Sequence, residues 1–283
     1  MLTEAATKVL LYAAVLQTIG AAAAFWVVMQ PMTGGVGAAG HITAEGAIRR
    51  VGLRASVAVV VALMLRGWAH TVTVFGLAQS TSWDAISTIV GESRWGGSWR
   101  IQVLAALVCV VAYALVGRGR RSLQVATAIA SAALALALTS TGHAAGAPGR
   151  MAIHTAHVLG AGMWLGTLTT LVSVRQSVDR TLRRSIFRAF ARVAFTGAAM
   201  LVAAGIVASW WYVGSFANLW TSAYGRVLLI KVGLVGGVVA CGYVNWRAIE
   251  SGQSEPGRAA LVELMFAGAV VMATGVLTEL EHP

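Results

Sequence analysis

The chain of 283 residues is 58% hydrophobic and only 11% charged, whereas an average soluble domain is about 45–50% apolar and about 25% charged. This balance excludes an ordinary soluble enzyme and also a disordered chain, which has few apolar residues and many charges. The two cysteines exclude a scaffold held by several disulfides. The composition therefore indicates an integral membrane protein, in which the position of the basic residues must explain the formal net charge of +11.

Eight apolar runs are long enough to cross a bilayer, for which about 20 mostly apolar residues are needed. None of them shows the two-residue alternation of a membrane barrel, so we expect helices. The runs cover residues 8–30, 54–78, 100–117, 122–142, 152–174, 192–213, 226–247 and 259–280. The predicted fold is all-α, a polytopic membrane helix bundle with about eight transmembrane helices.

Basic residues gather in the connections that follow the odd-numbered runs. These connections and the adjacent helix ends hold 14 of the 21 Lys and Arg residues, whereas the even-numbered connections and the termini hold 5. Because cytoplasmic loops carry the excess of Lys and Arg, we expect the odd-numbered connections in the cytoplasm and both termini outside. The charge is then a signal of topology, and we expect a lipid bilayer rather than nucleic acid as the partner.

Six tryptophans fall where this topology places the outer interface of the membrane. Amphipathic rings of this kind anchor helices at the level of the lipid headgroups. We therefore expect interface anchors at Trp83, Trp95, Trp99, Trp210, Trp211 and Trp220.

A weak internal repeat relates the two halves of the chain. Residues 93–96 and 222–225 each carry a Ser-x-aromatic-Gly element, before the third and the seventh run respectively. With four runs in each half, the halves would be parallel repeats about an axis along the membrane normal. We expect a single integral membrane domain over residues 1–283, with a weak repeat of 1–142 and 143–283 as two parallel four-helix halves.

Three histidines cluster around the connection between the fourth and the fifth run. His154 and His157 lie three residues apart and hence on one face of a helix, and His143 comes from the end of the preceding helix. Three imidazoles that converge from two helix ends predict a site for copper, zinc or iron. Met151 adds a soft thioether, which favours Cu(I). The alternative is that these histidines are solvated polar groups at the membrane surface.

His70 lies inside the second run, one turn from Arg66 and below the outer surface. Ionisable groups at such a depth face a cavity or a partner, so we expect His70 as a further ligand below the outer site. Met64 and Met163, both inside apolar runs, would hand Cu(I) onward. Alternatively, Arg66 and His70 satisfy polar groups of neighbouring helices.

Lys231 and Glu263 each place a charge inside one of the last two runs. Lys231 lies about one turn from the outer side of the seventh run, and Glu263 about one turn from the cytoplasmic side of the eighth. Because they lie near opposite faces of the membrane, we expect each of them to satisfy a local partner rather than to form a pair.

These residues together resemble the copper resistance protein D family, CopD, of bacterial inner-membrane copper proteins. The resemblance covers about residues 140–280, and its most specific stretch runs from Tyr224-Gly225 to Lys231. The first half fits only in its number of runs and in the stretch from Trp95-Gly96 to Arg100. The resemblance rests on Gly142-His143-Ala144, His157, Trp164-Leu165-Gly166, Phe190-Ala191-Arg192, Gly205, Thr221, Tyr224-Gly225, Leu228, Lys231, Asn245 and Glu263.

The resemblance implies an eight-helix protein of the bacterial inner membrane, with both termini in the periplasm and a role in copper uptake or tolerance. It also implies a small periplasmic copper carrier of the CopC type as a partner. No carrier domain is fused to this chain, so we expect a separate carrier. The expected function is copper import and homeostasis without enzymatic activity, in which copper binds at the outer histidines and moves toward the cytoplasm.

Two alternatives remain from the residues themselves. Two histidines on different helices can ligate a haem, so His70 with His143 or His157 would suit a haem b or quinone-linked redox protein. A structural membrane subunit would bind neither metal nor haem. The chain has no Walker loop, so we do not expect it to drive transport with ATP by itself.

Overall fold

The computed structural model of the protein describes residues 2–28, 38–117, 120–141, 144–251 and 258–280. Within these ranges the chain is almost entirely helical and has no strand, which confirms the all-α prediction. Eight described segments are long and apolar enough to cross a membrane, and each overlaps one predicted run. They are Glu4–Val28, Gly40–Phe75, Arg94–Leu115, Arg121–Leu138, Pro148–Ser177, Arg180–Val213, Ala223–Ala248 and Ala260–Leu277.

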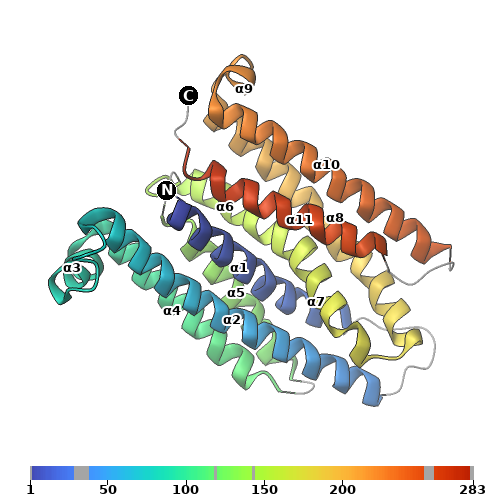
Figure 1. Cartoon of the computed structure of the whole chain (residues 1–283). Helices are drawn as coiled ribbons and strands as arrows, with labels where there is room; N and C mark the ends of the chain where they lie inside the picture. The colour runs from blue at the N-terminus through green and yellow to red at the C-terminus, as the bar shows by residue number, and fades with distance from the viewer. Residues whose placement is uncertain (1, 29–37, 118–119, 142–143, 252–257, 281–283) are drawn as a thin grey trace.

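The helices run back and forth as one bundle (Figure 1). The fifth span is composite, because the π-helical turn η2 and the 3-10 turn η3 continue α6 and α7 without a break. In chain order the elements are α1 (Leu2–Val28), α2 (Ala38–Phe75), α3 (Trp83–Ser87), η1 (Thr88–Glu92), α4 (Arg94–Leu115), α5 (Arg121–Leu138), α6 (Pro148–Ala161), η2 (Gly162–Gly166), α7 (Thr167–Val174), η3 (Arg175–Ser177), α8 (Arg180–Val213), α9 (Asn218–Thr221), α10 (Ala223–Glu250) and α11 (Arg258–Leu277).

Local sequence signals begin and end several of these helices. The side chain of Ser93 accepts a hydrogen bond from the Gly96 amide (2.8 Å) at the start of α4, and Asp179 caps α8 in the same way. Pro148 occupies the first turn of α6, where its missing N–H costs nothing. Gly214 ends α8 with φ of +69°, a conformation that favours glycine.

Two helices begin well before the apolar runs that predict them. The helix α2 begins at Ala38 rather than near residue 54, and α8 begins at Arg180 rather than near residue 192. Hydropathy reports only the apolar part of a helix, whereas backbone hydrogen bonding continues through polar turns. In α2 the added turns have a structural use, because Arg49 donates to the carbonyls of Tyr113 (3.1 Å) and Ala114 (2.9 Å) at the end of α4.

The first helix lies in the middle of the bundle. It contacts α2 and α5 on one side and α7, α8 and α11 on the other, as Figure 1 shows. In its most apolar stretch 67% of the residues are buried, the largest such share among the eight spans. A helix that is apolar all round is typical of this position. The core of the protein therefore forms around α1.

Pairs of glycines let α1 and α8 approach the fifth span closely. A Cβ atom on Gly20 would lie 1.8 Å from the carbonyl carbon of Gly166, and one on Gly160 would lie 2.6 Å from the carbonyl oxygen of Gly197. Between helices in lipid there is no hydrophobic driving force, and small residues at such crossings allow the close van der Waals packing that stabilises the contact instead. These contacts fix the position of η2, which carries Met163 and Trp164.

The start of α1 and the end of α11 lie at the same end of the bundle, as an even number of spans requires (Figure 1). An ion pair between Lys8 and Glu279 joins them there. The short helices α3 and α9 belong to connections at this end, which we call the terminal end of the bundle.

Candidate functional site

A cavity of about 690 Å³ lies among α1, α6, α8, α10 and α11. Most of its lining is apolar, and among the described residues no aspartate or glutamate lines it. The cavity brings together His154 and His157, two of the predicted ligands, with Arg66, Trp164 and Lys231. The polar lining residues are Lys8, Tyr12, Arg66, Thr139, Thr141, His154, His157, Ser209, Tyr212, Ser215, Tyr224, Lys231, Thr274 and Thr278.

His154 enters the cavity from α6 and is held by a tyrosine from α8. Its Nε2 lies 3.0 Å from the hydroxyl of Tyr212, and the two rings are tilted with their centroids 5.6 Å apart. The Arg150 guanidinium lies 5.8 Å from the centroid of the same tyrosine ring. Tyr212 therefore fixes the orientation of the imidazole.

His157 lies one turn further along α6. Its Nδ1 is 3.1 Å from the carbonyl oxygen of Leu201, and because a carbonyl only accepts, Nδ1 carries the proton and donates. The lone pair of the neutral ring is then on Nε2. Gly205 makes room for the ring, since a Cβ atom there would lie 3.4 Å from its Cε1.

Lys231 lines the same cavity. It acts electrostatically on His157, as does His154, so the three side chains form one electrostatic group. Within the described part of the chain, Lys231 makes no ion pair and no hydrogen bond through its side chain. The expectation of a local partner for Lys231 is therefore not met by the described residues.

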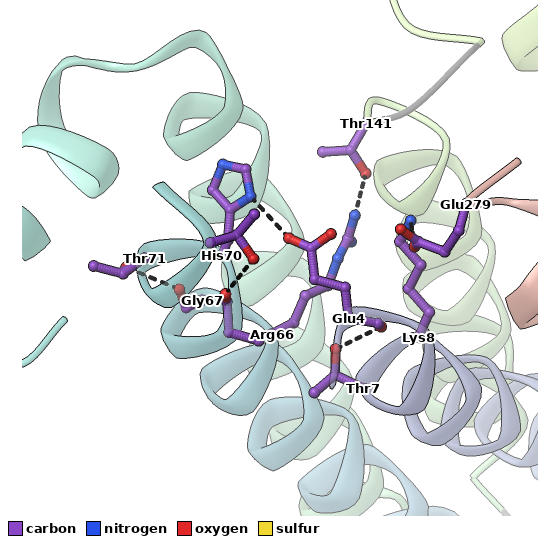
Figure 2. A network of polar contacts seen from close by, with 11 residues as sticks. Glu4, Thr7, Lys8, Arg66, Gly67, His70, Thr71, Thr141 and Glu279 are labelled. Carbon is purple, nitrogen blue, oxygen red and sulfur yellow. Dashed lines mark hydrogen bonds and ion pairs between the residues drawn. The ribbon is translucent and has the colours of Figure 1, made fainter. Parts of the chain in front are cut away.

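His70 lies in a polar network between α1 and α2, shown in Figure 2, whose members Lys8, Arg66 and Thr141 also line the cavity. Its Nδ1 is 3.4 Å from Oε1 of Glu4. Arg66 donates to Gln102 and Thr141, each at 3.4 Å. These are the contacts expected if both residues satisfy neighbouring helices. His70 does not line the cavity, and its role as a metal ligand stays a prediction.

Trp95 differs from the other predicted interface anchors. Its ring stacks on His70 with centroids 4.0 Å apart, and Trp99 beside it donates to the carbonyl of Leu63 at 2.8 Å. Both rings are only partly exposed, whereas Trp83 and Trp210 are 79% and 71% exposed. Both pack against α2, and their role as interface anchors stays a prediction.

Glu263 has local partners, as predicted. Its carboxylate accepts a hydrogen bond from Asn245 Nδ2 (2.7 Å), and the side chain of Trp164 interacts with it. The residue is only 2% exposed, and Gly242 makes room for it, since a Cβ atom there would lie 3.2 Å from Oε1. Trp164 also lines the cavity, so it borders both the cavity and Glu263.

Several predicted ligands are not gathered around the cavity. Met64 is 42% exposed on the outside of α2, and Met163 lies against Gly197 of α8. Met151 does not line the cavity, and His143 lies outside the described residues. In the described part of the chain no three His, Cys, Asp or Glu side chains come together as a metal site. The three-histidine site thus stays a prediction.

The sequence reasoning missed Tyr212, Glu4 and Trp95 as partners of the histidines. Each lies far from its histidine along the chain, so no spacing rule connects them. The sequence offered one weak signal for them: each carries a polar side-chain atom near the outer end of an apolar run, at about the depth predicted for a histidine. The haem alternative gains no support from the described residues, because His70 and His157 do not share the cavity.

Comparison with known proteins identifies the family. The family model described as "Copper resistance protein D-like, N-terminal domain" matches residues 2–153, and "Copper resistance protein D" matches residues 184–277. The first match extends the resemblance through the first half, beyond the few residues expected there. No solved structure matches the chain.

The chain is also similar to the copper transport protein CutJ of Bacillus subtilis (strain 168), with 25% identity over 207 residues. The alignment covers 68% of this chain but 38% of the relative, so the chain spans about two fifths of that protein's length. Together with the eight apolar helices, these matches show that the chain belongs to the copper resistance protein D family of copper-related, multi-pass membrane proteins.

Proposed function

We propose that the protein accepts copper at His154 and His157 from the periplasmic side of the bacterial inner membrane and moves it toward the cytoplasm. The observation that carries this proposal is the convergence of the two imidazoles on one cavity, each with one ring nitrogen held by a neighbour. Membership of the family supports copper as the cargo.

His157 has the arrangement expected of a metal ligand. Metal-binding histidines commonly donate their second ring N–H to a carbonyl or carboxylate, which fixes the tautomer and the ring. Leu201 provides that carbonyl, so Nε2 of His157 has the lone pair that copper requires. For His154, the contact of Nε2 with the Tyr212 hydroxyl holds the second imidazole at the cavity.

Two imidazoles leave coordination positions for further ligands. We propose His143 and Met151 for them, because Ala144 lines the cavity and so the connection before α6 borders it. Met151 lies three residues before His154 on the same helix face. Imidazole and thioether ligands together suit Cu(I).

The inward route would pass Trp164. Trp164 borders both the cavity and the Glu263–Asn245 pair, and it is carried by a π-helical turn, a feature frequent at functional sites. Movement of Trp164 would connect the cavity to Glu263 and Met163. Copper would reach the terminal end on a separate carrier of the CopC type, and the step is binding and transfer without enzymatic chemistry.

The test is a titration of Cu(I) into the purified full chain in the presence of a competing chromophoric chelator. The control variant is His41→Ala, because His41 lies near the start of α2 and does not line the cavity. This control and the wild type should bind Cu(I) equally. The double variant His154→Ala/His157→Ala should lose at least about tenfold in affinity, or about 1.4 kcal/mol. An unchanged affinity and stoichiometry in a folded double variant would contradict the proposal.

A further inference from the structure

The cavity is far larger than a copper ion and its ligands require. Its volume of about 690 Å³ lies in the range of pockets that enclose organic molecules, about 300–1,000 Å³. Its walls away from the histidines are apolar, with Val202 of α8, Leu228 and Val235 of α10 and Val270 of α11 among them. The volume and the apolar walls of the cavity therefore fit an apolar organic molecule, which copper binding alone does not require.

The charge of the lining is one-sided. Lys8, Arg66 and Lys231 line the cavity, and no carboxylate does so among the described residues. Lys8 is paired with Glu279, and Arg66 has hydrogen bonds and an electrostatic contact with Glu4. Lys231 is the cation for which the described part of the chain supplies no partner.

An unpaired ammonium at this position is costly. Lys231 follows the start of α10 by eight residues, which is about 12 Å along the helix, and ionisable groups inside a span pair with something or serve a ligand. An anion that enters the cavity would remove this cost. It would also offset the positive charge that acts on His157 and so favour a cation there.

We propose that the cavity binds a single-chain organic carboxylate, with the carboxylate on the Lys231 ammonium and the apolar chain along α8, α10 and α11. The ligand class goes beyond the proposed copper site, and its binding does not require copper. A neutral or cationic amphiphile of the same length fits the walls but lacks the charge that Lys231 selects.

The test is photo-crosslinking in copper-free protein, reconstituted in nanodiscs of phosphatidylcholine. The probe is dodecanoic acid with a diazirine on its chain, and the comparison probe is the corresponding dodecylamine. In the wild type the acid should label residues of α8, α10 and α11 that line the cavity. The Lys231→Met variant should lose about tenfold of this labelling, which corresponds to about 1.4 kcal/mol, whereas Lys231→Arg should retain it.

Arg226→Gln on the exposed outer turn of the same helix is the matched control and should label like the wild type. Size-exclusion profiles establish that each variant is folded. Equal labelling by the acid and the amine, or labelling unchanged in Lys231→Met, would overturn the proposal. Displacement of the acid by phosphatidylglycerol in the nanodisc would also overturn it, because the occupant would then be a two-chain lipid.

Discussion

The Nδ1 of His157 donates to the carbonyl oxygen of Leu201 across 3.1 Å, and this bond joins α6 to α8 inside the cavity wall. The acceptor is a backbone atom, so it holds the ring independently of solvent and of any titrating side chain. The bond determines the tautomer and places the lone pair on Nε2. The copper-binding proposal depends on this orientation.

A larger side chain at Gly205 should disturb the His157 ring without removing it. A Cβ atom at this position already lies 3.4 Å from Cε1 of His157, so Gly205→Leu must displace the imidazole. We expect a loss of about 10–100-fold in Cu(I) affinity, as for other residues that orient a metal ligand. Gly233→Leu is the control, because nothing lies within 4 Å of a Cβ atom there. Equal Cu(I) affinities in the two variants would contradict a role of His157 in copper binding.

The glycine crossing between α1 and the fifth span should control stability. Gly20→Ala would bring Cβ to 1.8 Å from a backbone carbon of Gly166, so the helices must separate. We expect a loss of about 1–3 kcal/mol in the free energy of unfolding, measured in detergent. Gly268→Ala, an exposed position with open space around it, should be neutral or gain up to about 1 kcal/mol. Similar stabilities for both variants would argue against the close crossing.

The contact between Asn245 and Glu263 should appear as an energetic coupling. We expect a double-mutant cycle of Asn245→Ala and Glu263→Ala to give an interaction energy of about 1–3 kcal/mol, because the carboxylate is 2% exposed. The control cycle uses Tyr243 and Arg247 on the exposed face of α10, where we expect less than about 1 kcal/mol. A coupling near zero for the buried pair would show that Glu263 is held by other groups.

The orientation of the bundle can be tested at the two ends of one helix. Ser177 and Ser215 are both exposed and flank α8. In a background with Cys109 and Cys241 replaced by alanine, Ser215→Cys should react with a membrane-impermeant maleimide added to the periplasmic side. Ser177→Cys should react only after the membrane is permeabilised. The reverse pattern would invert the topology and, with it, the direction of the proposed copper transfer.

The eight spans could be predicted because hydropathy and length decide them almost alone. The central place of α1 could not, since a helix in lipid is apolar whether it faces lipid or protein, and its position depends on crossings such as Gly20 with Gly166. The starts of α2 and α8 were predicted too late because their first turns are polar.

The candidate site could be predicted only in part. The spacing of His154 and His157 correctly placed them together, because residues three apart share a helix face. The partners Tyr212 and Leu201 come from another helix and follow from tertiary packing. For the same reason, the sequence alone could not show that Trp95 stacks on His70.

The most direct test of the copper site is X-ray absorption spectroscopy of the purified protein loaded with one equivalent of Cu(I). The wild type should show the multiple scattering of imidazole ligands, and His154→Ala/His157→Ala should lose it at the same copper loading. The same imidazole signal in that double variant, or a shell of sulfur alone in the wild type, would contradict copper binding by His154 and His157.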